Sequence, residues 1–328
     1  MLLFITAVIL GFIILIWSAD QFVDGAASLA QHWGVSPLII GMLIVGLGTS
    51  APEMLVAASA ALQGNPELGI GNAIGSNITN ITLVLGVTAL IVALPIHSNI
   101  LKKELPLVLV AGLLSWYLLS DGEFSRIDGV ILLSGLFVII AWMIYTAKNN
   151  RNQHDPFLEE GAEEIPEEMP FKKALFWMIA GLLLLMLSSK MLVWGASNIA
   201  MLLGISDLII GLTIVAIGTS LPELASTISS AKKGETDLAI GNIVGSNLFN
   251  NLGVLAIPGL ISPSMVSAPV LSRDMPIMIG LTLLLMIFGL GCYKAARYRL
   301  VFWNGAVFFG LFIAYEGLLY YQTITAVG

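Results

Sequence analysis

The sequence has few of the charged residues on which soluble proteins rely. Only 11% of its 328 residues are charged, whereas 57% are hydrophobic, and the mean hydropathy is +0.94. Soluble domains carry about 25% charged residues. The shortage of charge argues against an ordinary soluble domain. It favours a polytopic membrane protein, because apolar segments long enough to span a bilayer recur along nearly the whole chain.

Cysteine and histidine are also scarce. Cys292 is the single cysteine, which excludes an internal disulfide and a cysteine metal cluster. The three histidines, His32, His97 and His154, fall near the ends of apolar segments or in a polar loop. Met1 leads into an apolar stretch without a basic region or a small-residue cleavage site, so we expect this stretch to be a membrane span.

Ten apolar segments are long enough to cross the membrane, and we expect an all-α polytopic protein. The expected spans are 2–32, 36–62, 67–93, 104–120, 127–147, 173–203, 206–231, 237–262, 275–293 and 300–320. A polar loop at 148–172 divides the chain into a first unit, 1–147, and a second unit, 173–328. This loop holds seven of the 21 acidic residues and lacks EF-hand ligand spacing, so we expect a solvated acidic linker.

The two units are copies of one another. Residues 41–90 align without a gap to residues 211–260 and give 22 identities in 50 positions, at a constant offset of 170. Each unit has an odd number of spans, so the second copy must enter the membrane upside down, as an inverted repeat. The first and sixth spans have about 31 residues and would reach ~46 Å, against ~30 Å of hydrocarbon, so we expect them to lie obliquely.

Basic residues indicate the orientation of the ten spans. If the N-terminus faces outward, the outside loops hold only Arg126 and Arg273. The inside loops then hold Lys102, Lys103, Lys148, Arg151, Lys172, Lys173, Lys232, Lys233, Lys294, Arg297 and Arg299. This bias follows the positive-inside rule and predicts both termini outside, with the 148–172 linker in the cytoplasm.

Each copy carries two polar stretches inside apolar segments. The first copy has "GTSAPE" at 48–53 and "GNAIGSNITN" at 71–80; the second has "GTSLPE" at 218–223 and "GNIVGSNLFN" at 241–250. A carboxylate in hydrocarbon costs at least ~2.5–3.5 kcal/mol, so Glu53 and Glu223 require compensation. Such a kink alone is often only a packing device, but its duplication beside a glutamate favours a functional site.

Proline within a membrane helix should break it and expose carbonyl oxygens. Pro52 has no N–H and its ring clashes with the carbonyl four residues earlier, so we expect the helix to release carbonyls such as those of Gly46 and Thr49. Gly71 and Gly75 should let neighbouring backbones approach closely. The other expected oxygen donors of the first copy are Ser50, Glu53, Ser76 and Asn80; Asn77 is expected to face a neighbouring helix.

The second copy repeats this donor set. It supplies the carbonyls of Ala216 and Thr219 and the side chains of Ser220, Glu223, Ser246 and Asn250. Inversion would bring both sets together near the bilayer midplane. Hard oxygen ligands without sulfur or imidazole suit Ca²⁺ and Na⁺ and disfavour zinc or copper. Two carboxylates neutralise one Ca²⁺ or accommodate several Na⁺, so the two ions can compete for one site.

The paired stretches resemble the two alpha-repeats of the calcium/cation antiporter superfamily, and most closely its prokaryotic sodium/calcium exchanger group. The resemblance covers essentially the whole chain. It implies Na⁺/Ca²⁺ exchange by alternating access in a prokaryotic plasma membrane, with no cofactor and no protein partner. It also implies that the first and sixth helices move across a static core formed by the other eight.

The same resemblance assigns roles to individual residues. Glu53 and Glu223 match the shared carboxylates of the family. The other matched positions are Thr49 and Thr219 as calcium-binding carbonyls, Ser50, Ser76, Ser220 and Ser246 as sodium-binding hydroxyls, Gly46 and Ala216 as further carbonyls, and Asn80 at the central site. Asn250 is a departure, because several relatives have an aspartate there. Its amide argues against K⁺ co-transport.

Three other functions are weighed against this interpretation. Calcium/proton exchangers are the nearest, but that branch typically carries a "GN…E" signature where this chain has "GTSAPE". Cation channels usually repeat by rotation about the membrane normal, and this duplication is inverted. An intramembrane enzyme lacks support, because no histidine, cysteine or aspartate pair accompanies the glutamates.

Charged residues in the first and sixth spans raise a separate hypothesis. Asp20 and Asp24 share one face of the first span, and Lys190 occupies the position equivalent to Asp20 at the offset of 170. An ion pair between Asp20 and Lys190 would join the two copies. The alternative is that each side chain reaches water or headgroups near a helix end.

Overall fold

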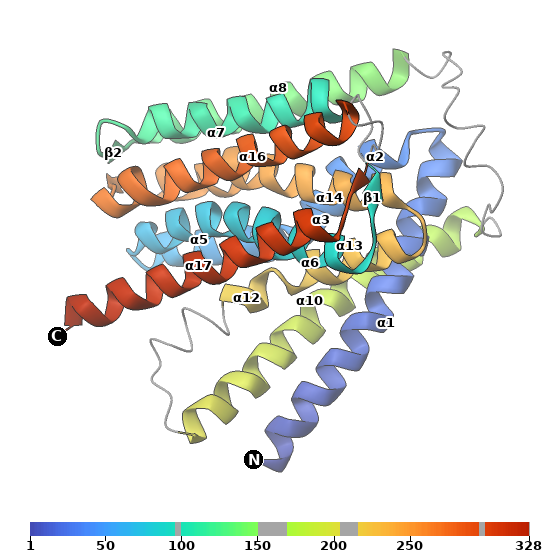
Figure 1. Ribbon diagram of the computed structural model, residues 1–328, viewed down its shortest axis with the longest axis horizontal. Coiled ribbons are helices and arrows are strands. Elements are labelled where there is room, and N and C mark those ends of the chain that lie inside the picture. Colours follow the sequence, from blue (N-terminus) through green and yellow to red (C-terminus); the bar gives the residue numbers. More distant parts are fainter. Residues whose placement is uncertain (96–99, 150–168, 204–215, 295–298, 328) are drawn as a thin grey trace.

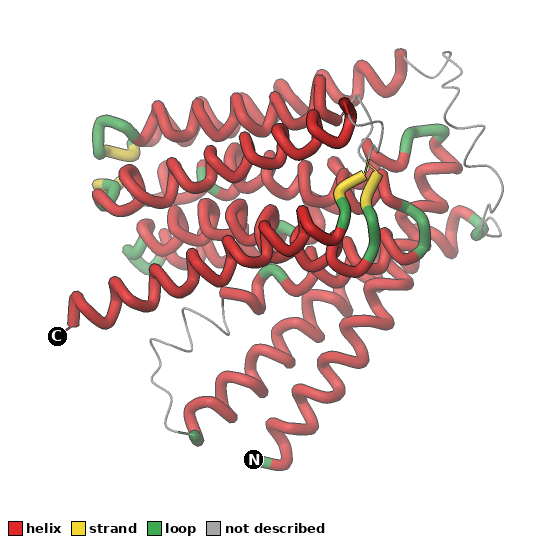
Figure 2. Tube along the Cα trace, in the orientation of Figure 1, coloured by secondary structure: helices red, strands yellow, loops and turns green. Residues whose placement is uncertain are grey.

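The computed structural model describes residues 1–95, 100–149, 169–203, 216–294 and 299–327. Helices dominate these residues, and most of them run in one common direction (Figure 1). Two long helices at the N-terminal ends of the two units, α1 and α10, lie side by side and project obliquely from the others (Figures 1 and 2). This arrangement agrees with the oblique course expected of the first and sixth spans.

The first unit consists of helices broken by short π-helical segments. Its elements are α1 (Leu2–Trp33), α2 (Pro37–Ile40), a π-segment (Gly41–Val45), α3 (Gly46–Thr49), α4 (Ala51–Leu62), α5 (Pro66–Thr79), a π-segment (Asn80–Leu85), α6 (Gly86–Ile91), β1 (Leu94–Pro95), a π-segment (Ile100–Glu104), α7 (Leu105–Leu119), β2 (Glu123–Phe124) and α8 (Arg126–Asn149).

The second unit repeats this order wherever it is described. Its elements are α10 (Phe171–Leu202), α12 (Ala216–Thr219), α13 (Leu221–Lys232), α14 (Thr236–Phe249), a π-segment (Asn250–Val254), α15 (Ala256–Ile261), β3 (Ser264–Met265), a π-segment (Val270–Asp274), α16 (Met275–Lys294), β4 (Arg299–Leu300) and α17 (Phe302–Val327). Several elements, among them α3, α4, α5 and their counterparts α12, α13, α14, begin and end at the offset of 170.

Eight helical stretches in the described part of the chain are long and apolar enough to cross a membrane. They correspond to eight of the ten expected spans. The expected span 104–120 contains α7, which has 15 residues and follows the charged Lys102, Lys103 and Glu104. The expected span 206–231 begins outside the described residues, as does most of the 148–172 linker. The count of ten spans stays a prediction.

Helices α1 and α10 expose large apolar side chains and pack against each other. Leu2, Phe12 and Leu183 are among the side chains that are more than half exposed, which is what a lipid-facing surface requires. The two helices approach closely through glycine. A Cβ built on Gly11 would lie 3.1 Å from Leu192, and one built on Gly181 would lie 2.7 Å from Phe22.

These two contacts are reciprocal. Gly181 and Leu192 occupy, in the second unit, the positions of Gly11 and Phe22 in the first. Each helix therefore uses the same glycine to contact the same position of its partner. Such reciprocity is the mark of a two-fold relation between two copies of one surface.

The centre of the molecule is formed by α5 and α14. Ile70, Ile74 and Ile78 repeat every four residues on α5 and are at most 1% exposed, while α14 is buried on all sides from Leu238 to Phe249. The short strands add two antiparallel pairs, β1 with β4 and β2 with β3. In both pairs, a strand that follows the central helix of one unit meets a strand that precedes the last helix of the other.

Candidate ion-binding site

The helix that carries each glutamate is broken at a serine. Ser50 (φ −82°, ψ 1°) separates α3 from α4, and Ser220 (φ −90°, ψ 4°) separates α12 from α13. Proline occupies the first turn of α4 and of α13, where its missing N–H costs nothing. The predicted break is confirmed. It places Glu53 and Glu223 in the first turn of a 12-residue helix, where the helix dipole stabilises negative charge by about 0.3–1 kcal/mol.

The expectation that the break releases the Gly46 carbonyl is wrong. The Ser50 N–H still donates to the Gly46 oxygen at 3.1 Å, because the break occurs after this hydrogen bond rather than before it. The Ser246 hydroxyl donates to the same oxygen at 3.3 Å. With both lone pairs engaged, the Gly46 carbonyl can contact an ion only when the Ser246 hydroxyl turns away.

The side chains predicted as ligands are buried, and many of their oxygens have no partner. Glu53 and Glu223 are 1% exposed, and none of their four carboxylate oxygens accepts a hydrogen bond within the described residues. The same holds for the hydroxyls of Ser50 and Ser220, for the Asn80 side-chain oxygen and for both polar atoms of the Asn250 side chain. Leaving a buried polar group unpaired costs about 1–3 kcal/mol, and more for a charged one. A bound cation would supply the partner that these oxygens lack.

Residues from the two units meet at this site. Glu53 and Glu223 are close enough to repel each other electrostatically, Ser76 lies beside Glu53, and Thr49 lies beside Glu223. The Thr49 hydroxyl is 3.3 Å from the Ser246 hydroxyl of α14. The structure thus brings the central predicted side chains into one buried cluster, and the contacts cross between the copies.

Neutral oxygens complete the cluster. Among the described residues, no group of three or more histidine, cysteine, aspartate or glutamate side chains could hold a metal ion. The two carboxylates are instead surrounded by hydroxyl and amide oxygens. Such a set suits weakly held, exchangeable hard cations better than a permanently bound transition metal.

An asparagine on each central helix fixes the backbone beside each glutamate. Asn72 donates to the Glu53 carbonyl at 3.3 Å, and Asn242 donates to the Glu223 carbonyl at 3.4 Å. Asn242 also accepts from the Thr49 hydroxyl at 3.0 Å. Our sequence interpretation missed both residues, although the "GN" that opens each polar stretch recurs at the offset of 170 and could have identified them.

Further amides join the two central helices. Asn77 donates to Asn251 at 3.0 Å, and Asn80 donates to Asn247 at 3.1 Å. The prediction that Asn77 faces a neighbouring helix is confirmed. Because the Asn80 nitrogen is held by Asn247, its unpaired oxygen has a fixed direction, as an ion ligand requires.

The central helices change their winding at the predicted asparagines. The π-helical segments Asn80–Leu85 and Asn250–Val254 begin at Asn80 and Asn250. Short π-helical insertions widen a helix by one residue and recur at functional sites. No pattern in the sequence predicted them, since their residues are as apolar as those of the adjoining helices.

In the second unit, a glycine of the polar stretch lets the backbones of two helices approach closely. A Cβ built on Gly245 would lie 2.3 Å from the Met42 carbonyl, so only glycine fits there. No atom of the described residues lies within 4 Å of a Cβ built on Gly71 or Gly75. The expectation for these two glycines stays a prediction. The residue equivalent to Met42 in the second unit, Leu212, lies outside the described residues.

The remaining predicted ligands lie at the edge of the cluster. Thr219 is half-buried, and the described part of Ala216 is its backbone at the start of α12. The Gly218 carbonyl between them accepts a hydrogen bond from Ser189 at 2.7 Å. The roles of the Thr219 and Ala216 carbonyls stay predictions.

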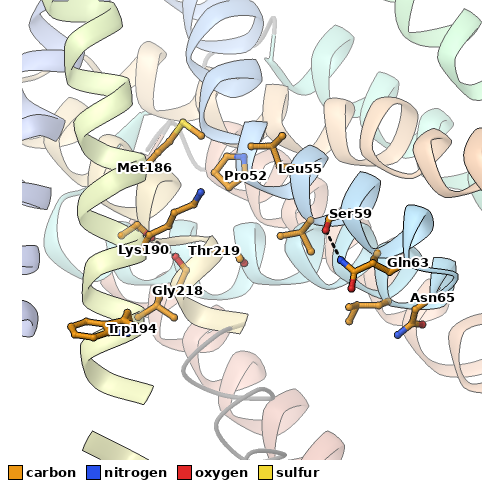
Figure 3. A pocket seen from close by; sticks show the side chains of 15 residues that line it. Pro52, Leu55, Ser59, Gln63, Asn65, Met186, Lys190, Trp194, Gly218 and Thr219 are labelled. Carbon is orange, nitrogen blue, oxygen red and sulfur yellow. Dashed lines mark hydrogen bonds between the residues drawn. The ribbon is translucent and has the colours of Figure 1, made fainter. Parts of the chain in front are cut away.

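The hypothesis of an Asp20–Lys190 ion pair is wrong. The Asp20 carboxylate accepts from the Ser229 hydroxyl at 2.5 Å, and its carbonyl accepts from Lys233 at 3.0 Å. Lys190 lines a cavity between α4 and α10 (Figure 3). Lys190 is exposed, which agrees with the alternative that its side chain reaches water or headgroups, whereas Asp20 is half-buried against α13 of the opposite unit.

Comparisons with known proteins show which proteins this chain is similar to. A family model described as sodium/calcium exchanger protein matches residues 3–145 and again residues 173–321. A relative from Alkalimonas amylolytica, named putative antiporter CaxA, is 45% identical over 313 residues, which cover 95% of this chain and 97% of the relative. A relative from Methanosarcina acetivorans, named sodium/calcium exchanger MaX1, is 30% identical over 345 residues, covering 95% and 97%.

The fold agrees with a solved structure as well. The sodium-calcium exchanger NCX_Mj, soaked with zero Na⁺ and Ca²⁺, is similar with a TM-score of 0.82 and 32% sequence identity. The match covers 97% of this chain and 99% of the solved chain.

Proposed function

Because the chain belongs to the sodium/calcium exchanger protein family, we propose that it exchanges Na⁺ for Ca²⁺ across a prokaryotic plasma membrane, with Glu53 and Glu223 as shared ligands. It is a transporter and not an enzyme. The observation that carries the proposal is the set of buried, unpartnered oxygens around these two carboxylates. The Na⁺ and Ca²⁺ ions would be coordinated directly by the cluster of oxygens described above. No resident cofactor is needed.

Charge explains why one site can serve both ions. Two ionised carboxylates carry a charge of −2, which one Ca²⁺ neutralises. Several Na⁺ ions neutralise the same charge when the hydroxyls of Ser50, Ser76, Ser220 and Ser246 share the coordination. Occupancy by one kind of ion excludes the other, since both require the same carboxylates.

The same charge opposes movement without cargo. Two bare carboxylates in a low-dielectric interior would be costly, so a change of access from one side to the other is favoured only with ions bound. Coupling between the two fluxes follows from this cost. The proposed motion is the sliding of α1 and α10 across the other helices, and their exposed apolar surfaces and mutual packing are suited to it.

We further propose ten spans arranged as two inverted repeats, with both termini outside. Reciprocal glycine contacts between α1 and α10 and the reciprocal strand pairs support a two-fold relation between the units. An axis in the membrane plane is required because each unit has an odd number of expected spans. In this orientation the α4–α5 loop lies outside, and the α13–α14 loop, with Lys232 and Lys233, lies inside.

Calcium flux in proteoliposomes tests the proposal. With Ca²⁺ outside and Na⁺ trapped inside, we expect uptake that disappears when the Na⁺ gradient is removed and that does not respond to an imposed pH gradient. K⁺ should neither replace Na⁺ nor be required, because Asn250 supplies an amide and not a third acid. Uptake driven by the pH gradient alone would identify a Ca²⁺/H⁺ antiporter and refute Na⁺ coupling.

A further inference from the structure

A cavity of about 510 Å³ lies between α4, α10 and α12. Its wall includes residues of both binding motifs, namely Pro52 beside Glu53, and Gly218 and Thr219 in the equivalent stretch of the second unit. Its other end is bounded by Gln63 and Asn65, at the loop between α4 and α5. The cavity thus extends from the ion-binding cluster toward the face that we place outside.

Among the residues that the structure describes, Lys190 is the only charged one that lines this cavity. Its amino group is directed from α10 toward Pro52 (Figure 3). Within the described residues, the Lys190 ammonium forms neither a hydrogen bond nor an ion pair with another side chain. No described side chain neutralises its charge, and because Lys190 is itself exposed, the charge acts on the mouth of the cavity through water-accessible surroundings.

A fixed positive charge at this position is unexpected beside a cation pathway. The equivalent position of the first unit carries the opposite charge, Asp20. The other described α10 residues of the wall, Met186, Ser189, Val193 and Trp194, have apolar or neutral side chains and so provide no partner for a cation. The charge faces the space between α4 and α10, where it can act on what enters the cavity.

We propose that Lys190 is a specificity-determining residue that disfavours Ca²⁺ relative to Na⁺ at the outer entrance. The inference rests on the proposed exchange function. A positive electrostatic potential lowers the local concentration of a monovalent cation by a Boltzmann factor. For a divalent cation, this factor is squared. If Lys190 lowers Na⁺ by about 3-fold, it lowers Ca²⁺ by about 10-fold, so it promotes Na⁺ entry and Ca²⁺ release on this side.

The potential can be measured without any transport. In a background in which Cys292 is replaced by serine, Ser59→Cys places a thiol in the cavity wall. The thiol is reacted with a cationic and an anionic methanethiosulfonate of similar size. Lys190→Gln should lower the ratio of anionic to cationic reaction rates by about 10-fold, and Lys190→Arg should leave the ratio unchanged.

Lys103→Gln is the matched control. Lys103 is exposed at the start of α7, outside the cavity, and should leave the ratio of rates unchanged when it loses its charge. An unchanged ratio in Lys190→Gln, or an equal fall in Lys103→Gln, would overturn the proposal. High ionic strength should reduce the effect of Lys190, because salt screens a charge that is accessible to water.

Ion competition provides the second readout, measured at the face from which Ser59→Cys is labelled. Lys190→Gln should lower the half-saturating Ca²⁺ concentration by about 10-fold and that of Na⁺ by about 3-fold, with the opposite face unchanged. Equal shifts for both ions would refute a role in selectivity. If the native protein exchanged no Na⁺ for Ca²⁺, the proposed function would fail, while the thiol rates would still decide whether Lys190 sets the potential of the cavity.

Discussion

The two regions that we propose as entrances, which occupy equivalent positions of the internal repeat, differ in charge and in closure. On one side α1 packs against α13, where Asp20 accepts a hydrogen bond from Ser229 at 2.5 Å and Asp24 forms an ion pair with Lys233 at 2.6 Å. On the other side, the equivalent faces of α10 and α4 bound an open cavity. The counterparts at the offset of 170 are Lys190 for Asp20, Trp194 for Asp24, Ser59 for Ser229 and Gln63 for Lys233.

This difference shows how a duplicated fold can serve a directional process. The backbone elements are conserved between the copies, but substitution has given one entrance an acidic wall with a basic partner and the other a lone cation. The closing contacts are polar and half-exposed, so each contributes little free energy. An exposed ion pair is worth about 0.2–1 kcal/mol, which permits the entrance to open and close reversibly.

The largest expected effect concerns the two glutamates, Glu53 and Glu223, which should be equivalent in the two copies of the repeat. Glu53→Gln or Glu223→Gln should each reduce Na⁺-dependent Ca²⁺ flux by more than about 100-fold, because a single carboxylate leaves the cation charge poorly neutralised in a low-dielectric site. Flux into proteoliposomes measures this. Glu67→Gln, at the exposed start of α5, is the matched control and should transport normally. A variant at either site that kept native flux would show that the copies are not equivalent.

A smaller effect is expected at Asn80 and Asn250, because the two equivalent side chains differ in their hydrogen bonds. Asn250→Asp should strengthen Ca²⁺ over Na⁺ by about 3- to 10-fold, because it adds a third negative charge next to the bound ion. Asn80→Asp is the same substitution at the equivalent position of the first unit. It should be less tolerated, since Asn80 donates to Asn247, and an aspartate would place two oxygens against each other. Equilibrium Ca²⁺ binding in the presence of Na⁺, with thermal unfolding as a check, separates the two outcomes.

Breaking the closed entrance should have a modest effect. Lys233→Gln should increase the labelling of Ser230→Cys, which is buried one turn earlier on α13, by about 2- to 5-fold. Combining Asp24→Lys with Lys233→Asp should restore native labelling, because the ion pair is rebuilt in the opposite sense. Labelling that stays at the native level in Lys233→Gln would show that this contact does not contribute to closure.

The smallest effect concerns Glu235, whose counterpart in the open entrance is the neutral Asn65. Burial and repulsion from Asp237 and Asp24 raise the pKa of Glu235 above its ordinary value of 4.5, and Lys233 opposes the rise. A raised pKa means that ionised Glu235 destabilises the folded protein. Glu235→Asn should therefore raise the melting temperature slightly at pH 8, and the gain should vanish below pH 4.5, where the folded and unfolded states are both protonated. An equal gain at both pH values would exclude this explanation.

The sequence predicted the helical membrane fold and the polar residues that meet in the candidate site. Apolar run lengths predicted the spans, and the exact offset between the copies predicted which helices would be equivalent. The duplicated glutamates identified the site, because an uncompensated carboxylate in hydrocarbon is too costly to occur twice by chance. Proline chemistry predicted a helix break in each motif, and the structure places the breaks at Ser50 and Ser220.

The parts that could not be predicted depend on tertiary contacts. The π-helical winding at Asn80 and Asn250 has no local sequence signal. The Gly46 carbonyl was expected to be free, yet it binds Ser246 of the other unit, a contact that only the folded arrangement reveals. The expected Asp20–Lys190 pair failed for a similar reason: equivalent positions in an inverted repeat lie at opposite entrances, so opposite charge at equivalent positions does not imply contact.

Calcium binding to the purified protein tests the central claim most directly, namely that one carboxylate from each copy holds the same ion. Isothermal titration of the native chain should give one Ca²⁺ per protein, displaced by Na⁺, and the heat of binding should disappear in Glu53→Gln and equally in Glu223→Gln while both variants keep native thermal unfolding. Undiminished Ca²⁺ binding in either folded variant would contradict the account, because the two glutamates would then not share one ion.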